Sequence, residues 1–120
     1  MDNKRVLGAN YEQNACDYLT DNNIQILDRN FRCRIGEVDI IGRDEDALIF
    51  FEVKYRKNLS TGYPSEAVDY RKQRKISKVA DYYRYAKKIP DNMNIRFDVI
   101  SIVGDEINWY KNAFPYQGNL

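Results

Sequence analysis

Residues 38–55 read VDIIGRDEDALIFFEVKY, and this stretch predicts a β-hairpin. Two apolar arms flank residues 43–46, whose four charged side chains have the composition of a turn. The second arm, residues 47–55, is apolar on both faces through Phe51, which is typical of a strand in the middle of a sheet. We therefore expect the fold to be built around this hairpin.

Two carboxylates interrupt the apolar arms of the hairpin, Asp39 in the first and Glu52 in the second. With the turn at residues 44–47, they lie opposite each other on one face, with Cβ atoms about 5 Å apart. Like charges so placed repel, and a divalent cation such as Mg²⁺ or Mn²⁺ between them would relieve the repulsion. Lys54 follows on the same face by strand alternation. The alternative is a structural salt bridge between Lys54 and one of the acids.

The rest of the chain fits one domain, because 120 residues is the length of a single core. Hydrophobic periodicity predicts a helix over residues 4–21, and residues 58–64 are an uncharged loop. We expect the other elements to be a strand at 24–27, a polar connection at 30–36, a helix at 66–88 capped by Ser65, and strands at 96–103 and 107–110. The order αβββαββ predicts an α/β fold with helices on a mixed sheet. We assign residues 1–110 to this domain and 111–120 to a loosely held tail.

Both helices carry further candidate residues. At about 100° per residue, Glu12 borders the apolar face of the first helix and Lys72 lies inside that of the second. Residues 66–90 hold eight basic and three acidic side chains, and four of the basic ones form a stripe of one sign: Arg71, Arg74, Lys75 and Lys78. Such a stripe attracts phosphate backbones. Each feature has a structural alternative. Glu12 could simply be exposed at the edge of its helix, Lys72 could extend from the apolar face to solvent, and the basic stripe could be a solvated helix face.

Composition narrows the chemistry. The sequence has no histidine and two cysteines, Cys16 and Cys33, which excludes Ser-His-Asp triads, imidazole metal sites and Cys₄ zinc sites. Catalysis would rest on carboxylates, lysine, tyrosine or a cation held by oxygen ligands. No secretory pattern opens the chain, and its apolar runs are short. We expect a cytoplasmic protein without a membrane partner.

Asp39, the Glu52-Val53-Lys54 segment and the helical Glu12 together resemble the PD-(D/E)XK nuclease superfamily. A larger ordered set resembles the YraN family of small bacterial endonuclease-like proteins, which is similar to archaeal Holliday-junction resolvases. The set is GANYEQNA at 8–15, RNFR at 29–32, GEVDII at 36–41, FEVKYR at 51–56, KQRKI at 72–76 and RFDV at 96–99. The resemblance implies a restriction-endonuclease-like mixed β-sheet flanked by helices.

The resemblance also implies roles for individual residues. Asp39, Glu52 and the carbonyl of Val53 match ligands of Mg²⁺ or Mn²⁺, and Lys54 matches the lysine that orients or deprotonates the attacking water. Glu12 matches a supporting glutamate. Substrate contacts or site support are implied for Gly36-Glu37, Arg56 and Lys72.

The expected function is metal-dependent endonucleolytic hydrolysis of nucleic acid, with DNA favoured over RNA and branched or structured DNA included. Junction-resolving relatives act as symmetric dimers, so the resemblance allows a homodimer. One alternative is a non-catalytic nucleic-acid-binding protein of the same fold. Another is an interaction protein whose ten tyrosines serve an interface.

Overall fold

The computed structural model describes residues 4–58 and 68–118, with the side chains of residues 4–10 left out. Its elements follow the predicted order αβββαββ, which is confirmed. They are α1 (Lys4–Asp21), β1 (Gln25–Arg32), β2 (Glu37–Arg43), β3 (Ala47–Arg56), α2 (Tyr70–Ala86), β4 (Asn94–Val103) and β5 (Glu106–Tyr110). In this part of the chain, neither helix is long and apolar enough to cross a membrane.

The strands form one five-stranded sheet in the order β1-β2-β3-β4-β5. β3 and β4 pair in parallel, and the other neighbours pair antiparallel. The chain passes from β3 to β4 through α2, because parallel neighbours need a long crossover. β3 is the central strand, as its apolar sequence predicts.

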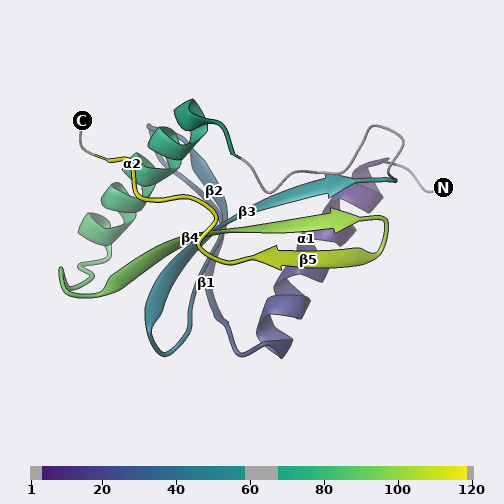
Figure 1. Ribbon diagram of the computed structural model, residues 1–120, viewed down its shortest axis with the longest axis horizontal. Helices are drawn as coiled ribbons and strands as arrows, with labels where there is room; N and C mark the ends of the chain where they lie inside the picture. The colour runs from purple at the N-terminus through teal and green to yellow at the C-terminus, as the bar shows by residue number, and fades with distance from the viewer. Residues whose placement is uncertain (1–3, 59–67, 119–120) are drawn as a thin grey trace.

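The helices cover opposite faces of the sheet, so the sheet is the middle of three layers (Figure 1). On one face, α1 packs Ala15, Cys16 and Leu19 against side chains of β2, β3 and β4. On the other, α2 packs four buried residues against the sheet: Ile76, Val79, Ala80 and Tyr83. Both buried helix faces follow the helical period of the sequence.

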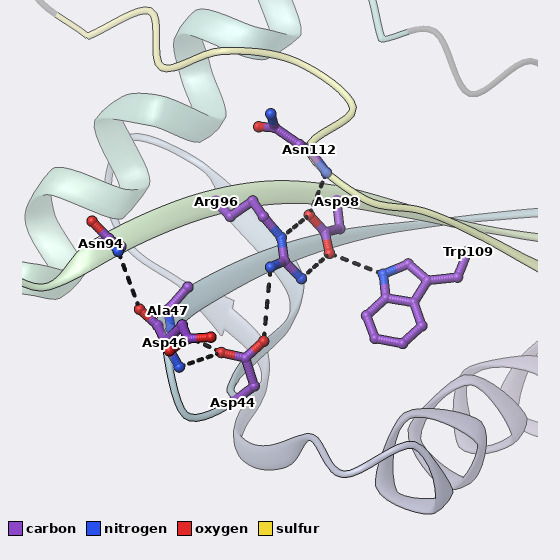
Figure 2. A network of polar contacts seen from close by, with 8 residues as sticks. All are labelled: Asp44, Asp46, Ala47, Asn94, Arg96, Asp98, Trp109 and Asn112. Carbon is purple, nitrogen blue, oxygen red and sulfur yellow. Dashed lines mark hydrogen bonds and ion pairs between the residues drawn. The ribbon is translucent and has the colours of Figure 1, made fainter.

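The buried carboxylate of Asp98 on β4 links β4, the edge strand β5 and the segment after β5 by hydrogen bonds (Figure 2). Asp98 is fully buried, and its two oxygens accept four hydrogen bonds of 2.8–2.9 Å. The donors are Nε and a terminal nitrogen of Arg96, the indole of Trp109 and the backbone N–H of Asn112. Because these donors replace water, the carboxylate is satisfied in the interior.

The first strand is longer than its sequence predicts. We expected residues 24–27 as a strand and residues 30–36 as a connection, but β1 continues to Arg32. Residues 28–32 pair with β2, and the register shifts between Ile26 and Asp28. Pairing with a neighbouring strand therefore overrides the polar composition of residues 28–32.

The second helix begins later than expected. It starts at Tyr70, and the N-cap is Asp69, whose side chain accepts the backbone N–H of Lys72. Val68 and Asp69 are not helical, so a helix from residue 66 is wrong at these positions. The predicted cap, Ser65, and Glu66 lie outside the described residues.

The expectation of a loosely held tail is wrong for residues 111–118. Phe114 is buried in the α2-side core and stacks on Phe97. The backbone N–H of Gln117 donates to Ser77 Oγ, and Tyr116 donates to Asp81. The segment runs beside α2 (Figure 1). The buried ring of Phe114 and these hydrogen bonds hold it there, although it forms no helix or strand.

Candidate active site

The β2–β3 hairpin opens at Asp39. Its ladder runs from Arg43↔Leu48 to Ile40↔Phe51, which confirms the predicted register over these residues. The next position in this register places Asp39 opposite Glu52. There the Asp39 carboxylate accepts the Val53 N–H at 2.8 Å.

The backbone of β2 departs from strand alternation around Asp39. Val38 packs in the core on the α2 side, whereas Ile40 packs on the α1 side. Residues two apart in a regular strand share a face, so β2 is twisted here. In an antiparallel ladder the N–H and C=O of one residue point to the same neighbour. The Val53 carbonyl is therefore directed to the side on which Asp39 lies.

The environment of Asp39 disfavours its negative charge. The pKa of Asp39 is raised from 3.8 to about 6, first by burial and then by the carboxylate of Glu52. The Glu12 carboxylate raises this pKa further, while the Val53 N–H and the Lys72 ammonium lower it. Glu12 and Glu52, which come from two other elements, thus both act electrostatically on Asp39.

Glu12 reaches this point from α1. It is half-buried, in agreement with a position at the border of the apolar face. The preceding residue, Tyr11, stacks on Tyr55 of β3 with ring centroids 4.7 Å apart. Burial and then the charge of Glu12 raise the pKa of Tyr11, followed by Asp39 and Glu52. The middle of α1, at Tyr11 and Glu12, therefore lies near the two strand carboxylates.

Glu52 is paired with a lysine of α2 rather than left facing Asp39 alone. The Lys72 Nζ atom lies 2.7 Å from Glu52 Oε2. The side chain of Glu52 is 13% exposed and that of Lys72 is 51% exposed. Lys72 is thus not in the core, and its pKa is raised chiefly by the hydrogen bond to Glu52. The sequence predicted Lys72 as a nucleic-acid contact and did not reveal this pairing.

These groups surround a hollow of about 430 Å³ between the opened hairpin and the start of α2. Its lining combines four acids, three cations and a glycine: Glu37, Asp39, Glu52, Asp69, Arg71, Lys72, Lys75 and Gly36. Asp69 was missed in the sequence, although an aspartate directly before a helical pattern is a signal for an N-cap.

Lys54 lies on the same strand as Glu52 but outside the described lining of this hollow. Val53 packs on the α1 side, so alternation places Glu52 and Lys54 on the α2 side. Lys54 is half-buried and pairs in register with Ser101 of β4. Ser101 is buried, and its hydroxyl has no hydrogen-bond partner among the described residues. The structure therefore gathers Asp39 and Glu52 in one hollow, whereas Lys54 lies two residues further along β3 and outside the described lining.

The predicted basic stripe lines a second hollow of about 530 Å³. Its lining is Ile35, Tyr70, Arg71, Arg74, Lys75 and Lys78. Arg56, the remaining predicted contact, is exposed at the end of β3 and lies outside the described lining of both hollows. Four of the six predicted nucleic-acid contacts thus line one hollow, whereas Lys72 pairs with Glu52.

The oxygen atoms at this site suit a hard cation that needs few protein ligands. No group of three or more His, Cys, Asp or Glu side chains is placed to hold a metal ion within the described residues. Asp39 and Glu52, with the Val53 carbonyl, instead offer two carboxylates and one backbone oxygen. Mg²⁺ is commonly held by one or two carboxylates, with water and substrate phosphate completing its shell.

Comparison with known proteins places the chain among relatives of the same length. A UPF0102 protein of Lachnoclostridium phytofermentans is 44% identical over 98% of this chain and 99% of its own. One from Fusobacterium nucleatum is 46% identical over 92% of each chain. A solved structure, a repair endonuclease from Pyrococcus abyssi, matches 86% of this chain and 40% of that chain, at 18% identity and a TM-score of 0.41.

The model of the uncharacterised protein family UPF0102 matches residues 11–102, which include every strand and helix residue placed in the site. Because this match and those relatives span most of the chain, the protein belongs to the UPF0102 family, the group that its sequence identifies as YraN.

Proposed function

We propose that the protein is a divalent-metal-dependent endonuclease that hydrolyses phosphodiester bonds in nucleic acid, with DNA as the preferred substrate. The observation that carries the proposal is the convergence of Asp39 and Glu52 where the hairpin opens. Burial and then the charge of Glu52 raise the pKa of Asp39, and a bound cation would offset the repulsion between the two carboxylates. The resemblance of these residues to the PD-(D/E)XK pattern supports the same reading.

Asp39, Glu52 and the Val53 carbonyl would hold Mg²⁺ or Mn²⁺. A cation there supplies positive charge that polarises a phosphodiester oxygen and lowers the pKa of a bound water. Lys54 would orient the attacking water and offset the negative charge that develops on the phosphoryl group. Glu12 supports the site from α1 through its charge, which already acts on Asp39.

Lys72 has a second task in this proposal. Its ammonium neutralises Glu52, and half of its side chain is exposed. A flexible, half-exposed lysine can exchange a carboxylate for a phosphate oxygen at little cost. Lys72 thus compensates Glu52 before substrate arrives and contacts the substrate afterwards.

A second candidate function is nucleic-acid binding without cleavage. The specific observation in its favour is the same ion pair, because Lys72 satisfies the charge of Glu52 with no metal present. The basic hollow beside it would then suffice for binding.

The test compares the unmodified protein with Glu52→Gln on labelled single-stranded, duplex, flap and four-way substrates of DNA and RNA. We expect Mn²⁺-dependent cleavage that chelator stops and that Glu52→Gln lowers by orders of magnitude, while binding persists. The fold should tolerate the change, since Lys72 can return to solvent. Glu106→Gln, at an exposed glutamate of β5, is the matched control. Binding of these substrates without any Mn²⁺-dependent cleavage would favour the second candidate.

We also propose that the protein acts in the cytoplasm. Both cysteines, the buried Cys16 and the half-buried Cys33, are unpaired, and thiols stay reduced in that compartment.

A further inference from the structure

The basic hollow is not lined by charge alone. It contains two large apolar side chains that are open to solvent, Ile35 at 40% and Tyr70 at 53% exposed. They come from the connection before β2 and from the first residue of α2. Exposed apolar side chains beside clustered cations are more than a backbone-binding face needs, because cations and hydrogen-bond donors make the phosphate contacts.

Tyr70 is placed for stacking. The guanidinium carbon of Arg74 lies over its ring, 5.8 Å from the centroid. That cation supports one side of the aromatic group, and the exposed fraction leaves area for a second planar ligand. Nucleobases stack on such tyrosines whatever their identity, because every base has a π-face.

The cations of this hollow have no acidic partners among the described side chains. Ion pairs engage Arg32, Arg84, Arg96 and Lys72, but none engages Arg71, Arg74, Lys75 or Lys78. Their charge is therefore available to an external anion. A strand of linked phosphates matches several cations in a row along a helix.

The hollow adjoins the candidate active site. Arg71 and Lys75 line both hollows. The Lys75 methylenes pass so close to Gly36 that a Cβ there would lie 3.2 Å from them. A nucleic-acid strand whose phosphate reached Asp39 and Glu52 would thus bring its neighbouring nucleotide to Tyr70.

We propose that this hollow is a subsite for an unpaired nucleotide next to the scissile phosphate. The base stacks on Tyr70 and contacts Ile35, and the phosphates bind the four cations. The inference rests on the proposed function and adds a substrate class, which is nucleic acid with single-stranded character at the cleavage point. Paired bases inside a duplex offer no open face to Tyr70, whereas unpaired bases in flaps, single-stranded overhangs and open junctions do.

The experiment measures binding by fluorescence anisotropy in chelator, so that cleavage plays no part. The probes are a single strand, a 5′-flap and a blunt duplex of equal length, each as DNA and the single strand also as RNA. Tyr70→Ala should weaken binding of the single strand and flap by about tenfold, the loss of one stacked base, and change duplex binding by less than about twofold. Tyr70→Phe, which keeps the ring, should bind like the unmodified protein.

Tyr85→Ala is the matched control, since Tyr85 is 84% exposed on the same helix but outside this hollow. A 2-aminopurine base at the unpaired position should be quenched by the unmodified protein and by Tyr70→Phe, but not by Tyr70→Ala. Equal losses on single strand and duplex, or no loss on either, would overturn the subsite. Binding that depends on Tyr70 without Mn²⁺-dependent cleavage would remove the nuclease proposal and leave the subsite. Mn²⁺-dependent cleavage, together with binding that does not depend on Tyr70, would remove the subsite and leave the nuclease proposal.

Discussion

Asp39→Asn should make the metal-free protein more stable at neutral pH while it abolishes metal binding. The change keeps the size of the side chain and leaves one oxygen to accept the Val53 N–H. It removes a charge that burial, Glu52 and Glu12 disfavour, which is why the pKa of Asp39 is raised to about 6. The fold therefore keeps this carboxylate in an environment that disfavours its negative charge.

The magnitude follows from the shift. A rise from 3.8 to about 6 corresponds to about 3 kcal/mol against the ionised form, at 1.36 kcal/mol per pKa unit. Since the folded-state pKa lies above the unfolded one, this group favours folding most below about pH 4, and the benefit is lost as pH rises to about 6. The neutral amide accepts a weaker hydrogen bond, at a cost of about 1 kcal/mol. Asp39→Asn should thus gain about 2 kcal/mol at pH 8.

The assay is urea unfolding in chelator at pH 8 and pH 4.5, followed by the fluorescence of Trp109, the single tryptophan of the sequence. Mn²⁺ should then stabilise the unmodified protein and leave Asp39→Asn unchanged. Asp105→Asn, the same chemical change at an exposed carboxylate, should alter neither property. Asp39→Asn that is less stable at pH 8, and still stabilised by Mn²⁺, would refute both the electrostatic reasoning and the ligand assignment.

Other substitutions test neighbouring contacts. Lys72→Met should tighten Mn²⁺ binding in calorimetry by up to about fivefold, because no ammonium then competes for Glu52. Unchanged affinity would mean that the ion pair is independent of the cation site. Tyr83→Phe removes the 2.8 Å hydrogen bond to Asp28 and should cost about 1 kcal/mol in urea unfolding. Asp98→Asn turns an NH₂ toward the donors of Arg96 or Trp109 and should cost about 3 kcal/mol, and a loss under 1 kcal/mol would contradict the network.

The hairpin and its carboxylates could be predicted because local rules determine them. A turn at residues 44–47 sets the register, which pairs Ile40 with Phe51 and by continuation puts Asp39 opposite Glu52. Alternation then places Lys54 on the side of Glu52. The period of α1 likewise places Glu12 at the border of its buried face. The proximity of Glu12 to Asp39 is not local, since it depends on how α1 docks on the sheet.

Contacts between distant elements were missed for the same reason. The angle of Lys72 around the helix axis predicted a place in the apolar stripe. That angle does not account for the length of the side chain, which lets the ammonium reach Glu52 of β3. The donors to Asp98 include the backbone of Asn112, in a tail whose composition gave no sign of packing. The cap at Asp69 is by contrast a local contact, which an aspartate directly before the helical pattern could have indicated.

The two carboxylates of the site are stabilised to different degrees, and this difference suggests how the site works. Glu52 is neutralised by a half-exposed lysine, a contact of about 1 kcal/mol or less that breaks readily. Asp39 has one backbone donor and a raised pKa, so its charge stays poorly compensated. A cation between them would relieve Asp39 and displace Lys72 from Glu52, and a substrate phosphate would then offer the displaced ammonium a new partner. Each ligand thereby favours the other, since such coupling is reciprocal.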